Sequence, residues 1–106
     1  MGILMQYIVL ALNLLAVLAI SPGSNAANIA AGKEKAIIIC AACHGANGIS
    51  PNDIWPNLAG QKKAYLIKQI EAFRNGQRAD PMMAPVVRTL TDTDVDNVAA
   101  YFSSLK

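Results

Sequence analysis

A five-residue string at positions 40–44, Cys-Ala-Ala-Cys-His, constrains this chain more than any other feature of its sequence. It contains both cysteines and the only histidine among the 106 residues. Two thiols spaced in this way can form thioethers with the two vinyl groups of one porphyrin, and the next residue then lies beneath the iron. The string therefore predicts one covalent haem c, attached through Cys40 and Cys43, with His44 as an axial ligand of the iron.

Three other roles are open to a Cys-x-x-Cys pair. A thioredoxin-like redox centre usually accompanies a βαβ pattern, which this sequence lacks. A zinc site needs four ligands, and beyond His44 the chain offers no further cysteine or histidine. A structural disulfide would close only a very short loop and would stabilise the domain little. Haem attachment is favoured over all three.

The second axial ligand of the iron cannot be another histidine. Beyond the apolar N-terminal segment the only methionines are Met82 and Met83. Methionine opposite histidine is the ligation of electron-carrying haems, and it raises their reduction potential. In a protein without haem such a pair would instead indicate flexible core filling. Either methionine fits at this point, and lysine ligation or an open sixth position is the alternative.

Residues 1–26 differ in character from the rest of the chain. All nine basic and seven acidic residues lie at position 33 or beyond. An apolar run over 3–20 is followed by Pro22 and Gly23, and then by Ser24 and Ala26, small residues spaced as a signal peptidase requires. We expect a secretory signal that is cleaved after Ala26, with an uncleaved membrane anchor as the alternative. Either way the remaining domain faces the periplasm, where c-type haem is attached.

The remaining domain, 27–106, is about 80 residues long, a size at which a protein core alone gives marginal stability. A buried cofactor would add to that core. The formal charge of the chain is +2, which two haem propionates would largely cancel. The basic residues form no long run, so the sequence gives no indication of nucleic acid as a partner.

Apolar spacing predicts three helices and no strands in this domain, which is an all-α fold. A first helix over 28–42 ends near residues 40–44 and has Gly32 as its weak point. The region 45–60 is rich in Gly, Pro and Asn and predicts a loop. The clearest helix covers 61–75, with Gly76 as its stop signal. Its apolar face is formed by Leu66, Ile70 and Phe73, with Tyr65 beside them.

A second loop over 77–90 carries both methionines and leads to the last helix, over 91–105. Thr91 can cap this helix, and Asp94 follows three residues later. Acidic residues in its first turns oppose the positive end of the helix dipole. Its apolar face is formed by Val95, Val98, Ala99 and Phe102.

The sequence resembles class I cytochromes c, in particular the short bacterial group that includes the single domains of cytochrome c4 and the c-553-type carriers. The resemblance covers essentially all of 27–106. The matching pieces are Ala-Gly-Lys at 31–33, the string and its glycine at 40–45, Pro-Asn-Leu-Ala-Gly-Gln at 56–61, Tyr-Leu at 65–66, Leu-Thr-Asp at 90–92 and Ala-Ala-Tyr-Phe at 99–102.

The resemblance implies two further assignments at the haem. The axial methionine of the family falls on Met83, with Met82 as its neighbour. The main-chain carbonyl of Pro56 is implied to accept the proton on the far nitrogen of His44, which would hold the ring and tune its basicity. The chain departs from cytochrome c4 in having one attachment string where that protein has two, so we expect a single haem and no two-haem function.

With both axial positions filled, substrate cannot reach the iron, and we expect no enzyme activity. The first and last helices are expected to cross beside the haem, and Tyr65, Leu66, Leu90 and Phe102 are candidates for the pocket wall. The implied function is single-electron transfer between redox partner proteins docked at an exposed haem edge. Docking would be steered by Lys62, Lys63 and Lys68, unless these lysines are simply a solvated helix face.

Two other functions stay open at this stage. One is a haem enzyme or gas sensor with an open sixth position, against which the methionine pair argues. The other is a haem subunit fixed in a larger oxidoreductase. Contact with a membrane is expected only through partners or through an uncleaved leader.

Overall fold

The computed structural model of the chain describes residues 2–3 and 26–106. Residues 26–106 form five helices and no strand, which confirms the predicted all-α fold. They are α2 (Ile29–Ile39), α3 (Ala41–His44), α4 (Lys63–Asn75), α5 (Met83–Val87) and α6 (Asp92–Ser104). The predicted leader, 1–26, lies almost entirely outside the described residues. None of the described helices is long and apolar enough to cross a bilayer.

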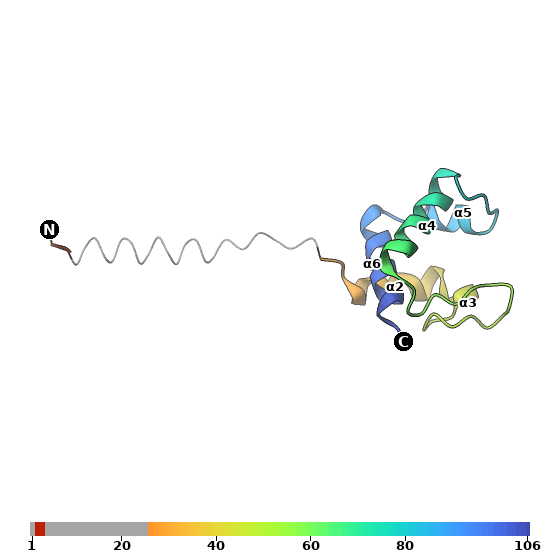
Figure 1. Ribbon diagram of the computed structural model, residues 1–106, viewed down its shortest axis with the longest axis horizontal. Coiled ribbons are helices and arrows are strands. Elements are labelled where there is room, and N and C mark those ends of the chain that lie inside the picture. The colour runs from red at the N-terminus through yellow and green to blue at the C-terminus, as the bar shows by residue number, and fades with distance from the viewer. Residues whose placement is uncertain (1, 4–25) are drawn as a thin grey trace.

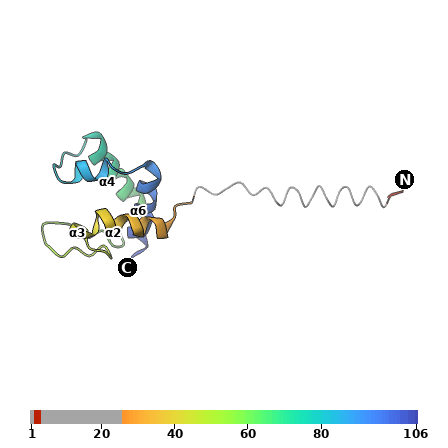
Figure 2. The ribbon, with the colours of Figure 1, turned by 180° about the vertical axis from the view of Figure 1, so that it is seen from behind.

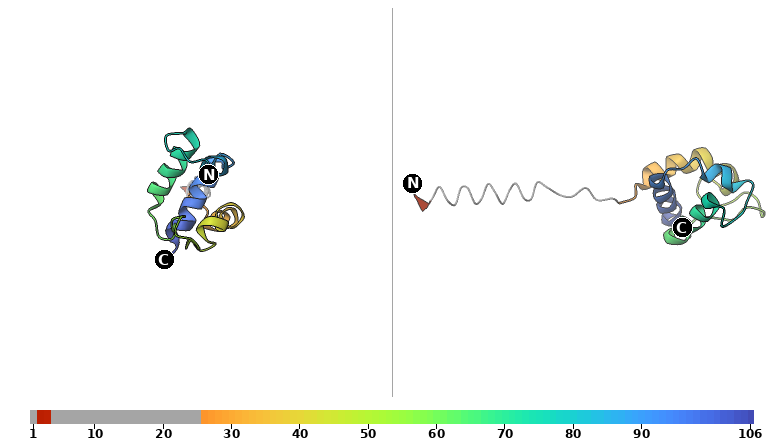
Figure 3. Two further views of the ribbon diagram at one scale, coloured as in Figure 1. Left: turned by 90° about the vertical axis from the view of Figure 1, so that its right-hand side faces the viewer. Right: turned by 90° about the horizontal axis from the view of Figure 1, so that it is seen from above.

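The most extensive helix contact is between α2 and α6, with α4 packed on the other side of α6 (Figures 1 and 3). The backbones come close at Gly32, where an added Cβ would collide with the main-chain oxygen of Asn97. Gly32 is a weak point for helix propensity, but the crossing requires it because no other residue leaves room for α6. The Asn28 side chain caps α2, and the Asn28 N–H donates to Asn97 Oδ1 at 2.8 Å.

The predicted first helix, 28–42, is wrong in one detail, because it is divided at Cys40. Cys40 closes α2 with φ −109° and ψ −32°, and α3 follows as a single turn. The chain path is nearly continuous, since the Cys40 N–H donates to Ala36 O at 2.8 Å and the His44 N–H donates to Cys40 O at 2.9 Å. The helical run still ends at His44, within the predicted region.

The predicted helix over 61–75 is confirmed as α4, which starts two residues later and is ended by Gly76 in the left-handed conformation. Leu66 and Phe73 are buried, and Ile70 is half-buried. The last helix begins with the predicted cap. Thr91 Oγ1 accepts from the Asp94 N–H, and the Asp94 carboxylate accepts from the Thr91 N–H, each at 3.0 Å. The bond from the Thr91 N–H to the carboxylate holds the pKa of Asp94 below its usual value of 3.8.

The apolar face predicted for the last helix is confirmed, because Val95, Val98, Ala99 and Phe102 are all buried in α6. The second predicted loop, 77–90, is wrong in part, because α5 lies within it. Asp80 and Pro81 lie two and one residues before Met82, the N-cap of this short helix, and an acidic residue followed by proline favours a helix start. Pro81 and Pro85 on either side of the methionines favour a loop in the sequence, but in the structure a short helix forms between them and beyond.

Two apolar clusters make up the core. The cysteine-side cluster consists of Ala36, Leu66, Val98, Ala99, Tyr101 and Phe102, and Cys40 packs against it. The methionine-side cluster consists of Phe73, Val87, Leu90 and Val95, and Met83 packs against it. Ile67 contacts both clusters. The fold therefore has one apolar side next to the attachment string and another next to the methionine pair.

Gly32→Ala should destabilise the protein. The change improves helix propensity by about 1 kcal/mol, whereas overpacking a tight contact costs about 1–3 kcal/mol. We expect a net loss of about 1 kcal/mol in the free energy of unfolding, measured by denaturant titration of the haem-loaded protein. Ala30→Gly, at an exposed position of α2, gives the propensity effect alone. A Gly32→Ala variant more stable than wild type would contradict the close crossing.

Candidate haem-binding site

The imidazole of His44 is held in a fixed orientation. His44 is the last residue of α3 and is only 7% exposed. Its Nδ1 lies 2.8 Å from the main-chain oxygen of Pro56, which confirms the expected partner. Because a carbonyl oxygen can only accept, Nδ1 carries the proton and Nε2 has the free lone pair. Nε2 is thus the nitrogen available to a metal.

The two cysteines begin the same short segment. Both are half-buried, and in this structure neither is part of a disulfide. Cys40 packs against the cysteine-side cluster. Burial raises the pKa of its thiol to about 11, which keeps the sulfur neutral at physiological pH. Cys40, Cys43 and His44 thus belong to one stretch anchored on α2 and α6.

The loop that supplies Pro56 is fastened to α6. Tyr101 Oη donates to the main-chain oxygen of Ala46 at 2.6 Å, and the Gly60 N–H donates to Phe102 O at 2.9 Å. Sequence reasoning missed the role of Tyr101, although a tyrosine on the apolar face of a helix needs a partner for its hydroxyl group. The histidine, its carbonyl partner and the last helix therefore form one connected unit.

The methionine pair is divided by exposure. Met82 is 57% exposed, whereas Met83 is half-buried against the methionine-side cluster. One carboxylate oxygen of Asp80 accepts the main-chain N–H groups of both methionines, each at 2.8 Å. These two bonds hold the pKa of Asp80 below its usual value.

The parts carrying His44 and Met83 are separate. In the described residues α3 packs mainly on α2, and α5 mainly on α4. Figures 1 and 2 show the α4–α5 side and the α2–α3 side of the domain apart from each other, both reaching the end opposite the N-terminus. Two thiols, an oriented imidazole and an inward thioether beside apolar clusters form a donor set that fits haem c.

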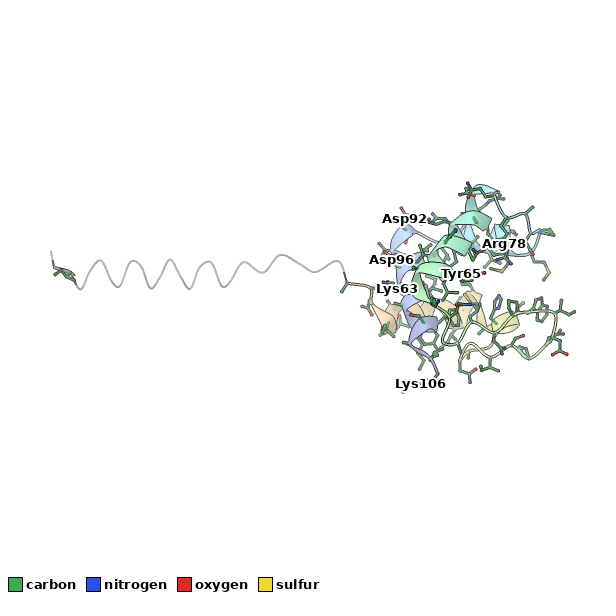
Figure 4. All side chains as sticks on the ribbon, viewed as in Figure 1. Lys63, Tyr65, Arg78, Asp92, Asp96 and Lys106 are labelled. Atoms are coloured by element: carbon green, nitrogen blue, oxygen red, sulfur yellow. The ribbon has the colours of Figure 1, made fainter. Side chains whose placement is uncertain are left out.

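The predicted wall residues are divided between the clusters. Leu66 and Phe102 belong to the cysteine-side cluster and Leu90 to the methionine-side cluster, whereas Tyr65 is 47% exposed. Figure 4 shows Tyr65 near Lys63 on α4. Lys62, Lys63 and Lys68 are all exposed, which is expected both for residues that steer docking and for a solvated helix face. Their part in docking stays a prediction.

Comparison with known proteins decides the family. The profile of the family described as cytochrome c matches residues 29–106, nearly all of the described domain. The chain belongs to the cytochrome c family. Family membership and the single attachment string together make this domain a haem-binding, electron-transfer domain with one covalent haem c.

Two relatives of similar identity differ in how much of their own length the chain matches. The chain is similar to cytochrome c4 of Pseudomonas aeruginosa, with 44% identity over 81 residues that cover 76% of this chain and 40% of that one. It is also 44% identical over 82 residues to cytochrome c-554(548) of Halomonas halodenitrificans, covering 74% of this chain and 98% of the relative. This cytochrome therefore spans less than half of the first relative and nearly all of the second.

A solved structure and a further relative extend the comparison. The reduced cytochrome c4 of Pseudomonas stutzeri superposes with a TM-score of 0.71 and 38% identity, over 76% of this chain and 47% of that one. A protein of Stutzerimonas stutzeri named thiosulfate dehydrogenase electron acceptor is 37% identical over 75 residues, which are 70% of this chain and 35% of its own length. The fold agreement supports the helical arrangement of this cytochrome.

Tyr101→Phe should loosen the loop that carries Pro56. The substitution removes one hydrogen bond to Ala46 while keeping the ring in the cysteine-side cluster, so we expect a loss of about 1 kcal/mol in the free energy of unfolding. Hydrogen exchange should accelerate at Leu58 and Ala59, whose N–H groups bond to Gly48 O in that loop. Unchanged exchange at both positions would show that the tyrosine does not hold the loop.

Proposed function

We propose that this cytochrome is a periplasmic carrier of single electrons in a respiratory or oxidative chain, with His44 and Met83 as the axial ligands of its haem iron. When bound, the haem supplies the iron that takes up and releases one electron. The proposal is carried by one observation: Nε2 of the only histidine is left free by the bond from Nδ1 to Pro56.

The chain's own residues suit a carrier. The Pro56 carbonyl fixes the tautomer and ring direction of His44, so the imidazole does not reorient when the iron changes charge. The half-buried position of Met83 supports it over Met82 as the thioether ligand, and thioether sulfur favours the reduced state. Apolar residues of both clusters limit water at the site, which limits reorganisation during electron transfer.

Docking of donor and acceptor proteins would use a small, transient surface. The loops next to the site expose apolar side chains, with Ile54 79% and Met82 57% exposed. Lys62, Lys63 and Lys68 on the start and face of α4 are free to steer an acidic partner. No enzymatic role is proposed, because a filled sixth position leaves no site for substrate on the iron.

The leader is proposed to be a signal peptide, 1–26, cut after Ala26. The Asn28 side chain caps α2 and its N–H bonds to Asn97, so the folded domain begins just beyond that point. A cut there would leave both contacts of Asn28 in place. An uncleaved anchor would instead hold the same domain at the membrane surface.

A second candidate function is a fixed haem subunit of a larger oxidoreductase. It is favoured by the relative named as an electron acceptor of thiosulfate dehydrogenase. The polypeptide would bind the haem in the same way in both roles. Purification from the native periplasm separates them, because a subunit elutes with its enzyme whereas a carrier elutes as a small protein.

Methionine ligation is tested by matched substitutions in the haem-loaded protein. The oxidised wild type should give a low-spin spectrum with the weak near-infrared band that reports methionine sulfur on ferric iron. Met83→Ala should abolish this band, and Met82→Ala should keep it, because Met82 points to solvent. The reduction potential should fall in Met83→Ala only, since the thioether stabilises ferrous iron.

The opposite spectrum would count against the carrier. High-spin iron that binds carbon monoxide readily in the wild type would mean an open sixth position, and the function would then be that of a haem enzyme or gas sensor. Retention of the band in Met83→Ala with loss in Met82→Ala would exchange the two assignments.

A further inference from the structure

Residues 80–83 are Asp-Pro-Met-Met, and Asp80 accepts hydrogen bonds from the main-chain N–H groups of the turn that starts there. Its carboxylate oxygen accepts from the Met82 and Met83 N–H groups, and its main-chain oxygen accepts from the Ala84 N–H at 3.1 Å. Pro81 has no N–H group to satisfy. Every main-chain donor of this turn is thus accounted for by one residue.

This arrangement fixes how α5 is rotated about its axis. The Asp80 carboxylate holds the N–H groups of Met82, the N-cap of α5, and of Met83, its first residue, and Pro81 restricts the φ angle just before them. Successive residues of a helix point about 100° apart, so adjacent methionines cannot both face the core. Met83 is half-buried and Met82 is 57% exposed, which is the result of this particular rotation.

The segment before Asp80 is itself attached to α4. The Arg78 N–H donates to Ala72 O at 3.0 Å, and its guanidinium donates to Gln69 Oε1 at 2.8 Å. The same guanidinium lies 4.5 Å from the centre of the ring of Phe73, a member of the methionine-side cluster. Arg78 therefore attaches the segment before the methionine turn to α4, and Asp80 joins that segment to the first residues of the turn.

We propose that Asp80 is the positioning residue that directs Met83, and not Met82, at the haem iron. The proposal rests on the proposed His44 and Met83 ligation. Asp80 touches neither the iron nor a substrate and acts only through the main chain of α5. Without its carboxylate, the turn loses two acceptor bonds at the two methionines, and the thioether becomes easier to displace.

Imidazole added to the oxidised, haem-loaded protein is the probe, because it competes with the thioether for the iron. Loss of the near-infrared band reports the displacement. Asp80→Ala should bind imidazole about fivefold or more tightly than wild type, the factor expected for loss of a helix cap. Asp80→Asn should stay near wild type, because the amide oxygen accepts the same N–H groups.

Two further variants separate position from charge and from stability. Asp80→Glu keeps the charge but lengthens the side chain, so it should resemble Asp80→Ala and not wild type, and it serves if Asp80→Ala fails to fold. Thr91→Ala removes the cap of α6 and lowers the midpoint of global unfolding while leaving the imidazole affinity unchanged.

Three outcomes are decisive. Tighter imidazole binding in Asp80→Ala and Asp80→Glu, with Asp80→Asn and Thr91→Ala near wild type, supports the positioning role. Wild-type affinity in Asp80→Ala and Asp80→Glu, with the band present in all variants, overturns the role but leaves Met83 ligation intact. Absence of the band from the wild type itself overturns both the ligation and the positioning role.

Discussion

The close crossing of α2 and α6 is the contact on which the haem site depends. Gly32 lets the two backbones approach, and Asn97 Oδ1 accepts from the N–H of Asn28, the N-cap of α2. Because α2 runs directly into the attachment string, its position against α6 sets where Cys40 and His44 lie. The same α6 holds the loop that carries Pro56, through Tyr101. The imidazole and its carbonyl partner are thus both located by one helix.

The two proposed ligands are supported in different ways, and this difference suits a carrier. The His44 side is built on long helices, a buried cluster and a side-chain hydrogen bond. The Met83 side is a short helix whose rotation depends on the acceptor bonds of Asp80. If Met83 binds the haem iron, its thioether, a soft ligand that favours the ferrous state, would need such local support to stay in place when the iron is ferric.

Local patterns in the sequence support the strongest predictions. The string ending in His44 predicts three haem bonds, which stays a prediction, and the predicted cap at Thr91 is confirmed. What sequence reasoning missed depends on contacts between distant segments. Gly32 is required because its backbone lies against α6, which is distant in the sequence. The helix break at Cys40 occurs where α2 passes into the attachment turn. The residues alone leave Met82 and Met83 equivalent, and the resemblance assigned Met83; the structure adds that Met83 is the less exposed of the two, a difference set by helix rotation.

X-ray absorption at the iron edge of the haem-loaded protein is the most direct test of the two-ligand arrangement. The spectrum should fit five nitrogen ligands and one sulfur ligand in both the oxidised and the reduced state, because His44 and Met83 are each held by their own part of the fold. A fit without sulfur in either state, or with the sulfur lost on oxidation, would contradict the description of this cytochrome as a carrier with both axial positions permanently filled.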